Sequence, residues 1–120
     1  MPISNQQISE AFSNGNFKFA FPFLADDIEW NIIGERILNG KEKVINFCSE
    51  TATYFASVTT VFITENIIAA DDVIAINGKG SFTNKEAKIT NVSSCDIYNF
   101  KEGKLKKITS YCITDHKKPL

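Results

Sequence analysis

Four long β-rich segments in the second half of the chain constrain the fold more than any other feature. They cover residues 57–70, 73–83, 89–100 and 105–115. Because short turns join them, an antiparallel meander is expected. A twelve-residue strand is about 40 Å long at ~3.3 Å per residue, longer than a flat sheet in so small a domain can use. We therefore expect the sheet to bend, with Gly78 and Gly80 as the points of bulging or kinking.

The first half of the chain carries helical patterns. Ser4 and Gln7 have the spacing of a capping box, and Ile8 and Phe12 follow at helical intervals. Gly15 is suited to end this helix in a left-handed conformation. These signals predict a first helix close to the N-terminus.

The phenylalanine-rich segment 16–24 fits two patterns. Its phenylalanines fall at every second position, which is typical of a strand, yet Phe17, Ala20 and Leu24 also share one helical face. Pro22 disfavours a strand, and it disfavours a helix too beyond the first turn. We predict a short helix for this segment.

A strand and a second helix follow. Ile28, Trp30 and Ile32 alternate with polar residues, which predicts a strand with one buried face that ends at Gly34, and an apolar stripe over 40–55 predicts a long helix. Helical patterns followed by strand patterns indicate the α+β class. We expect one domain over residues 1–120, in which a curved antiparallel sheet wraps around the N-terminal helices and forms a cone with an interior pocket.

Composition excludes several classes of function. Apolar residues make up 43% of the chain, no apolar run is long enough to cross a bilayer, and the N-terminus lacks the pattern of a signal peptide, so a cytoplasmic location is expected. Thirteen basic residues stand against fourteen acidic ones, without a basic stripe for nucleic acid. Three cysteines and the single His116 have no metal-ligand spacing, so neither a metal nor a cofactor is predicted.

Several short motifs together resemble a known family. They are Gly15-Asn16 after the first helix, the segment 24–30 with its Asp-Asp-Ile-Glu-Trp sequence, the segment 39–42, and the segment 98–105 with an aromatic residue before Gly-Lys-Leu. This arrangement is similar to the SnoaL-like branch of the nuclear transport factor 2-like superfamily, which has a cystatin-like fold. The family includes ketosteroid isomerases and polyketide cyclases as well as binding modules without catalytic activity. The resemblance therefore predicts the fold and leaves the chemistry open.

Asp96 is the leading candidate for a functional residue. Its strand resembles the ketosteroid isomerase strand whose aspartic acid stays protonated in an apolar site, a case in which a neutral carboxyl donates a hydrogen bond. Alternation places Asp96 on one face with Val92, Ser94 and Tyr98. Two interpretations stay open: Asp96 faces a ligand, or it is a structural acid that points outward or bonds to a neighbouring hydroxyl.

The other catalytic positions of the family match poorly. The isomerase base would fall at Asn31 or Ile32, and neither accepts a proton at neutral pH. Tyr111 occupies the place of an aromatic residue that cyclase-type relatives carry on the last strand, and Asp115, beside His116, is a weaker candidate on the same face. The only arginine, Arg36, is predicted in a loop beside Glu35 as a surface residue or part of an ion pair.

Four aromatic residues are expected to line the ligand pocket: Trp30, Tyr54, Tyr98 and Phe100. The leading hypothesis is binding of a small hydrophobic molecule, such as a ring compound. If the protein is an enzyme, Asp96 is expected to supply or stabilise charge in acid–base chemistry, and Tyr98 and Tyr111 to donate hydrogen bonds. The alternative is a module that binds a ligand or a protein without catalysis. We also expect a homodimer that forms through an outer sheet face carrying Val58, Thr60 and Phe62.

Overall fold

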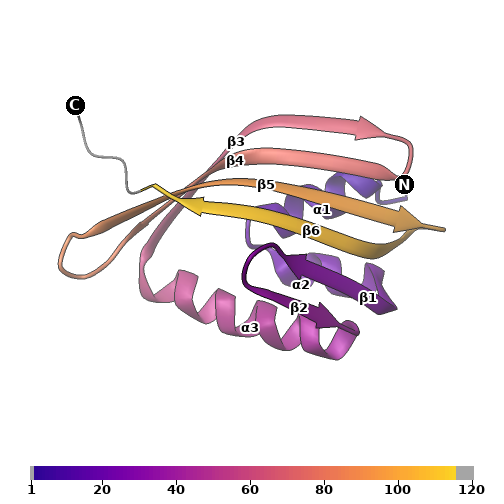
Figure 1. Ribbon diagram of the computed structural model, residues 1–120, viewed down its shortest axis with the longest axis horizontal. Coiled ribbons are helices and arrows are strands. Elements are labelled where there is room, and N and C mark those ends of the chain that lie inside the picture. The colour runs from indigo at the N-terminus through magenta and orange to yellow at the C-terminus, as the bar shows by residue number, and fades with distance from the viewer. Residues whose placement is uncertain (1, 116–120) are drawn as a thin grey trace.

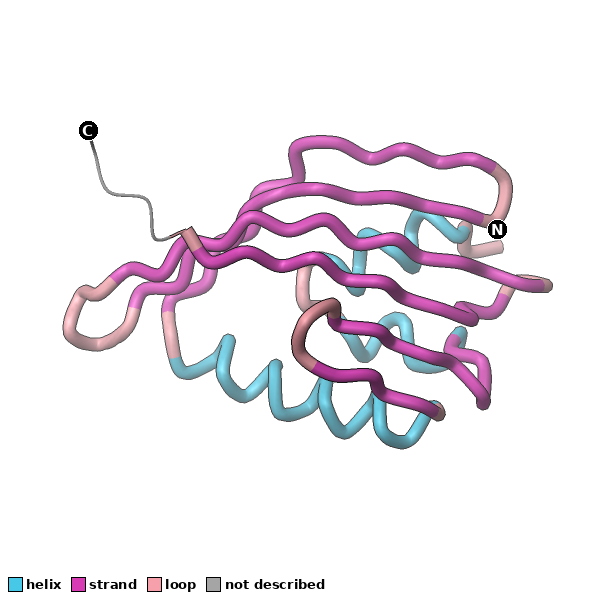
Figure 2. Tube along the Cα trace, in the orientation of Figure 1, coloured by secondary structure: helices cyan, strands magenta, loops and turns pink. Residues whose placement is uncertain are grey.

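The computed structural model describes residues 2–115 and contains one sheet with helices packed against one of its faces (Figures 1 and 2). The helices are α1 (Asn5–Ser13), α2 (Phe17–Ala20), the 3-10 helix η1 (Phe21–Phe23) and α3 (Lys41–Ser57). The strands are β1 (Leu24–Ile32), β2 (Arg36–Asn39), β3 (Thr59–Ala70), β4 (Val73–Thr83), β5 (Ile89–Lys101) and β6 (Lys104–Thr114). The order across the sheet is β2-β1-β6-β5-β4-β3, and the α+β class is confirmed.

The first helix begins and ends where the sequence predicts. The hydroxyl of Ser4 accepts a hydrogen bond from the backbone N–H of Gln7 at 3.1 Å, and the Gln7 side chain accepts one from the Ser4 N–H at 2.8 Å. Gly15 follows the helix with a φ of +81°, a conformation that glycine adopts without a steric penalty. The segment after it is helical, as predicted, with Pro22 in the first turn of η1, where its missing N–H is tolerated.

The long strands β3 to β6 form the expected antiparallel meander, and it bends at the expected place. The register between β3 and β4 shifts between Thr64 and Asn66, opposite Gly78. A Cβ atom on Gly78 would lie 2.3 Å from the carbonyl oxygen of Ile63. Only glycine allows the two backbones to approach this closely, so Gly78 permits the bulge from which the sheet curls.

The expectation of an entirely antiparallel sheet was wrong, because β1 pairs with β6 in parallel. The chain forms the antiparallel hairpin of β1 and β2 at one edge and crosses to the other edge through α3 (Figure 2). The meander then returns to β1, so that β6 arrives in the same direction. The strand β2, which begins at Arg36, was predicted as a loop because its four residues are too few to show a period.

The core lies between the helices and the inner face of the sheet. It contains Ile8 and Phe12 of α1, Val44 and Cys48 of α3, and inward side chains of four strands. Those strand residues are Leu24, Ile28, Trp30, Ile32, Ile74, Ile76, Tyr98, Phe100, Leu105 and Ile108. No helix in the described part of the chain is long and apolar enough to span a membrane.

The sequence analysis assigned the wrong residues to the outer face of β3, because its assignment of faces was shifted by one residue. Phe62 points inward, where its ring packs edge-on against Phe55 with centroids 5.2 Å apart, and Thr60 donates a hydrogen bond to the Phe55 carbonyl. Val61 and Ile63 are the exposed residues instead. A strand has a period of two, so an assignment of inward and outward residues that is shifted by one residue exchanges the two faces completely.

Candidate ligand-binding cavity

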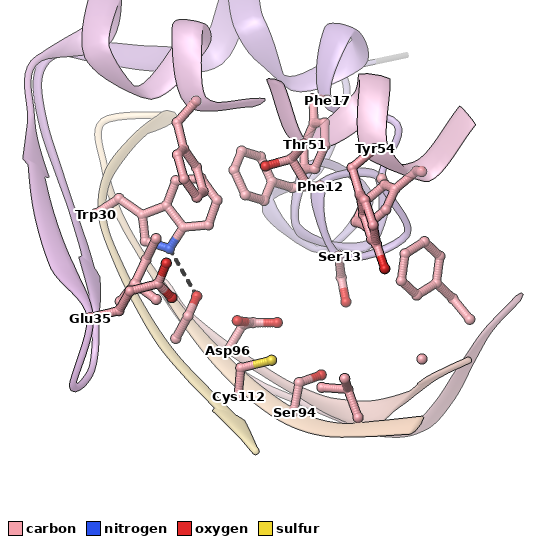
Figure 3. Close-up of a pocket in the computed structure, with 18 of the residues that line it drawn as sticks. Phe12, Ser13, Phe17, Trp30, Glu35, Thr51, Tyr54, Ser94, Asp96 and Cys112 are labelled. Carbon is pink, nitrogen blue, oxygen red and sulfur yellow. Dashed lines mark hydrogen bonds between the residues drawn. The ribbon is translucent and has the colours of Figure 1, made fainter. Parts of the chain in front are cut away.

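A cavity of about 460 Å³ lies between the curled sheet and the helices α1 and α3 (Figure 3). It exists because β3, β4 and β5 extend past the core and curve around the C-terminal half of α3. Ten aromatic or aliphatic side chains form most of its wall: Phe12, Phe17, Trp30, Ile32, Phe47, Tyr54, Phe55, Phe62, Phe82 and Val92. The polar side chains that line it are Ser13, Glu35, Thr51, Ser94, Asp96, Tyr98, Ser110 and Cys112.

One end of the cavity is a cluster of aromatic rings. Phe55 stacks on Phe82 with an interplanar angle of 9° and contacts Phe17 in a second stacked arrangement. Tyr54 packs against Phe82 with centroids 5.8 Å apart, and Figure 3 shows its hydroxyl directed into the cavity. The rings come from α2, α3, β3 and β4. The sequence analysis missed most of them because no single helix or strand pattern relates these positions.

Asp96 lies on the opposite wall with its carboxyl group directed into the cavity (Figure 3). It occupies the inner face of β5 and pairs across the sheet with Ser110 of β6 and Ile76 of β4. Burial raises the pKa of this carboxyl from 3.8 to about 6, although a hydrogen bond from the Ser110 side chain partly opposes the rise. The group therefore changes protonation state close to neutral pH.

Ser110 connects Asp96 to Trp30. The indole N–H of Trp30 donates a hydrogen bond to the hydroxyl oxygen of Ser110 at 2.9 Å, and all three side chains line the cavity. With its oxygen accepting from the indole, the Ser110 hydroxyl is free to donate its proton to the carboxylate of Asp96. This chain of donors holds the acid in place and leaves its other lone pairs for a ligand.

The charge of Asp96 contributes to raised pKa values in two further groups, Tyr98 and Cys112. Tyr98 is almost fully buried, and its pKa is raised well above the usual value, first by burial and then by the charge of Asp96, while a hydrogen bond with Ser13 opposes the rise. The pKa of the Cys112 thiol is raised by burial and by the charges of Asp96 and Glu35. Both groups are therefore neutral hydrogen-bonding groups at neutral pH.

Glu35 is a second carboxylate of the cavity wall that the sequence analysis did not select. It lies in the turn between β1 and β2, where its side chain is 57% exposed, and it forms an ion pair with Arg36 at 3.7 Å. The Arg36 guanidinium also lies over the ring of Phe47, 5.1 Å from its centroid. An acidic residue in a turn has no sequence pattern that distinguishes it from an ordinary surface residue.

The predicted site residues fall into two groups in the structure. Trp30, Tyr54, Asp96 and Tyr98 line the cavity, whereas Phe100 is buried in the core and does not reach it. Their roles toward a ligand stay predictions. The isomerase base has no counterpart at the expected place, because Ile32 forms the wall there.

The two candidate residues from the last predicted strand, Tyr111 and Asp115, do not line the cavity. Tyr111 is on the outer face of β6, where it pairs with Cys95 and is 45% exposed, so the expectation that it contacts the ligand was wrong. Asp115 lies at a separate hollow on the outer face, beside Val61 and Lys79. Strand alternation explains both positions, because Cys112 of the same strand points inward. The predicted assistance from His116 falls outside the described residues.

The polar groups of the cavity offer one partly buried acid, one acid at its rim, and several hydroxyls. Within residues 2–115, no three His, Cys, Asp or Glu side chains lie close enough together to hold a metal ion. The arrangement is suited to an apolar molecule with at least one polar group placed against Asp96.

Comparison with known proteins gives a consistent result. The chain is 39% identical to an NTF2-like protein of unknown function from Cytophaga hutchinsonii ATCC 33406, with 90% of this chain and 95% of that one covered and a TM-score of 0.83. No protein-family model and no curated protein matches the sequence.

More distant solved structures have the same fold. A proposed SnoaL-like polyketide cyclase from Jannaschia sp. CCS1 is 10% identical over 93% of this chain and 90% of its own, with a TM-score of 0.72. An NTF2-like protein from Anabaena variabilis ATCC 29413 is 12% identical over 92% of this chain and 85% of its own, with a TM-score of 0.73. At these identities the similarity concerns the fold alone.

Proposed function

Because the chain belongs to the nuclear transport factor 2-like (NTF2-like) family, we propose that its conical cavity binds a small hydrophobic molecule containing rings. The observation that carries this proposal is the carboxyl group of Asp96 in the wall of an aromatic cavity. The cavity volume of about 460 Å³ falls in the range of small-molecule sites, roughly 300–1,000 Å³. Stacked and edge-on phenylalanine rings provide surfaces for a planar ligand.

Asp96 would fix the orientation of the bound molecule. With a pKa of about 6, its carboxyl is able to accept a hydrogen bond as a carboxylate or donate one as the neutral acid. Ser94 and Ser13 direct their hydroxyls into the same space (Figure 3) and supply further hydrogen bonds. A ligand with one polar oxygen or nitrogen on an apolar body matches this distribution of groups.

A ligand screen tests this function. Thermal unfolding is measured with planar phenols, steroids and aromatic polyketide-like compounds for the wild type, Asp96→Leu and Glu86→Gln. Glu86 lies in the exposed turn between β4 and β5, so Glu86→Gln removes a carboxylate far from the cavity. The proposal requires a compound that stabilises the wild type and Glu86→Gln and stabilises Asp96→Leu much less. Equal shifts in all three proteins, or none in any, would contradict it.

A second candidate function is proton transfer at the same site, as in the isomerase and cyclase members of the family. The observation that favours it is the raised pKa of Asp96, because a carboxyl that titrates near neutrality serves as base and then acid. The carboxylate would remove a proton from a carbon beside a ring ketone and return a proton to the enolate. Deuterium exchange into 2-tetralone in heavy water tests this function: it requires exchange that the wild type accelerates and Asp96→Asn does not.

We also propose that two copies pair through the outer face of the sheet. The helices cover only the inner face of the sheet (Figure 1). The outer face exposes large apolar side chains on β3 and β6. Ile63 and Ile113 stand in one cross-strand row with Lys79 and Ser93 between them. Exposed apolar side chains on an uncovered sheet face favour association with a second copy. Light scattering after size exclusion tests this proposal, and a strict monomer at high concentration would overturn it.

A further inference from the structure

The charged side chains that line the cavity are both acidic. Among the described residues that line it, Asp96 and Glu35 are acidic and none is lysine, arginine or histidine. Arg36, which follows Glu35 in the sequence, is paired with Glu35 and lies over Phe47, and it does not line the cavity. The lysines of β6 face outward, where Lys106 and Lys107 pair with Asp27 and Glu29 of β1.

The two acids stand on different sides of the same space. Asp96 projects from the inner face of β5, and Glu35 from the turn after β1 (Figure 3). Cys112 lies close enough to both that each charge raises the pKa of its thiol. The side chains that line the cavity therefore bring only negative charge to it, and the partly apolar surroundings screen this charge less than water would.

The aromatic side chains of the wall also favour a cation over an anion. The face of an aromatic ring is its negative side, and a cation within about 6 Å of the ring centroid is attracted to it. Trp30 and Phe47 meet edge-on in the wall with centroids 5.3 Å apart, and Tyr54 directs its hydroxyl into the cavity. An ammonium group near Asp96 would meet a carboxylate and the hydroxyl oxygens of Ser94 and Ser110, which line the same cavity.

We infer that the molecule bound in this cavity is a hydrophobic amine, whose protonated nitrogen is held by Asp96 and whose rings lie in the phenylalanine cluster. This inference rests on the proposed ligand-binding function and names its ligand class. An ammonium group donates to the carboxylate, and the hydrogen bond between opposite charges is stronger than a neutral one. A carboxylate ligand of the same shape would be repelled by both acids and would find no cation.

Neutral ligands are the closest competitors, because the cavity also accepts a phenol or an alcohol through the hydrogen bonds of Asp96. The difference lies in the protonation of Asp96. An ammonium group beside it favours the carboxylate, whereas a neutral ligand that excludes water favours the uncharged acid. A set of probes equal in shape but different in charge therefore separates the classes.

The experiment uses three biphenyl compounds at pH 7.5: 4-biphenylmethylamine, 4-biphenylmethanol and 4-biphenylcarboxylate. Their dissociation constants are measured by calorimetry with the full chain and with the variants Asp96→Asn, Glu35→Gln and Glu86→Gln. The amine is expected to bind about tenfold more tightly than the alcohol, as one charge-assisted hydrogen bond allows, and the carboxylate is expected to bind more weakly than the alcohol.

The variants test which acid holds the amine. Asp96→Asn preserves the shape of the side chain and its ability to accept a hydrogen bond, so it should remove the preference for the amine and leave the alcohol nearly unchanged. Glu35→Gln, at the exposed rim, should weaken the amine only about two- to threefold because water screens that charge. Glu86→Gln should bind all three probes as the wild type does.

Each outcome has a definite meaning. An alcohol that binds as tightly as the amine, or an amine preference that survives in Asp96→Asn, would overturn the inference while the proposed ligand-binding function stands. A carboxylate that binds more tightly than the amine and the alcohol would also overturn the inference and leave the proposed ligand-binding function standing. Failure of all three probes to bind would count against both the inference and the proposed function.

Discussion

The indole N–H of Trp30 donates a hydrogen bond of 2.9 Å to the hydroxyl of Ser110, which in turn bonds to the carboxyl group of Asp96. Eighty residues separate Trp30 from Ser110 in the chain, and the parallel pairing of β1 with β6 places Ser110 opposite Ile32, two residues from Trp30 on the same face of β1. The cavity wall thus depends on the strand pairing that the sequence analysis did not predict. Through this contact the sheet controls the orientation and the protonation of the acid.

Substitution of Ser110 by alanine should raise the pKa of Asp96 above 6, because it removes the hydrogen bond that favours the carboxylate. It should also destabilise the fold by roughly 1–2 kcal/mol, since the buried Trp30 N–H loses its acceptor. Carbon-13 NMR of the aspartate carboxyls measures the pKa, and urea unfolding measures the stability. Thr109→Ala, one position away on the outer face, is the control and should leave the pKa unchanged. An unaltered pKa in Ser110→Ala would show that the serine does not bond to Asp96.

Asp96→Asn should stabilise the protein at neutral and alkaline pH. The folded pKa of about 6 lies above the ordinary value of 3.8, so the folded state binds more protons than the unfolded state between these values. Folding is therefore weakened as the pH rises through this window, by about 3 kcal/mol above it. At pH 8 the free energy of unfolding of Asp96→Asn should exceed that of the wild type by this amount.

The advantage of Asp96→Asn should disappear near pH 4, where the acid of the wild type is also neutral. Urea unfolding of both proteins between pH 4 and pH 8 measures the difference. A constant difference across this range would mean that the carboxyl titrates at its ordinary pKa. That result would remove the argument that Asp96 is desolvated by the cavity wall.

Gly78→Ala should destabilise the protein strongly, by about 3 kcal/mol or more, because the added methyl group meets a backbone carbonyl oxygen that has no room to move. Gly80→Ala, two residues along the same strand, is the matched control. Its methyl group meets side chains only, the rings of Phe82 at 3.1 Å and Phe62 at 3.4 Å, and both rings line the cavity. Denaturant unfolding should rank Gly78→Ala well below Gly80→Ala, and equal stabilities would contradict the close approach of β3 and β4.

Ile63→Lys should shift the dimer that we propose toward the monomer without unfolding it. The side chain of Ile63 is 59% exposed on the outer face, so a lysine there keeps the core intact but places charge in the contact. Light scattering over a range of concentrations measures the mass, and Ile3→Lys, at an exposed apolar residue just before α1, serves as the control. A dimer that persists in Ile63→Lys would place the contact elsewhere.

The sequence predicted those parts of the fold that depend on local patterns. The capping box at Ser4, the strand ends and the bend at Gly78 follow from residues near one another in the chain. The parallel contact of β1 with β6 and the short strand β2 depend on distant segments, and no local pattern encodes them. The outer face of β3 was exchanged because a period of two magnifies an error of one residue.

The candidate site shows the same distinction between residues that local patterns identify and residues that only distant contacts bring together. Asp96 and Trp30 could be selected because alternation placed them on inner faces of their strands, and both line the cavity. Glu35 could not, because its position depends on the turn after β1 and on how α3 packs beside it. The aromatic cluster of Phe55, Phe62 and Phe82 forms only when the curled strands meet the end of α3.

Trp30 is the only tryptophan of the chain and lines the cavity, so its fluorescence reports directly on whether a molecule enters. The most direct measurement is a titration of 4-biphenylmethylamine into the wild type and into Ser94→Phe, in which a phenylalanine ring would fill the space in front of Asp96. A saturable change in Trp30 emission in the wild type and none in Ser94→Phe is the result that ligand binding in this cavity predicts. No saturable change in the wild type with this amine or with 4-biphenylmethanol, or the same change in both proteins, would contradict it.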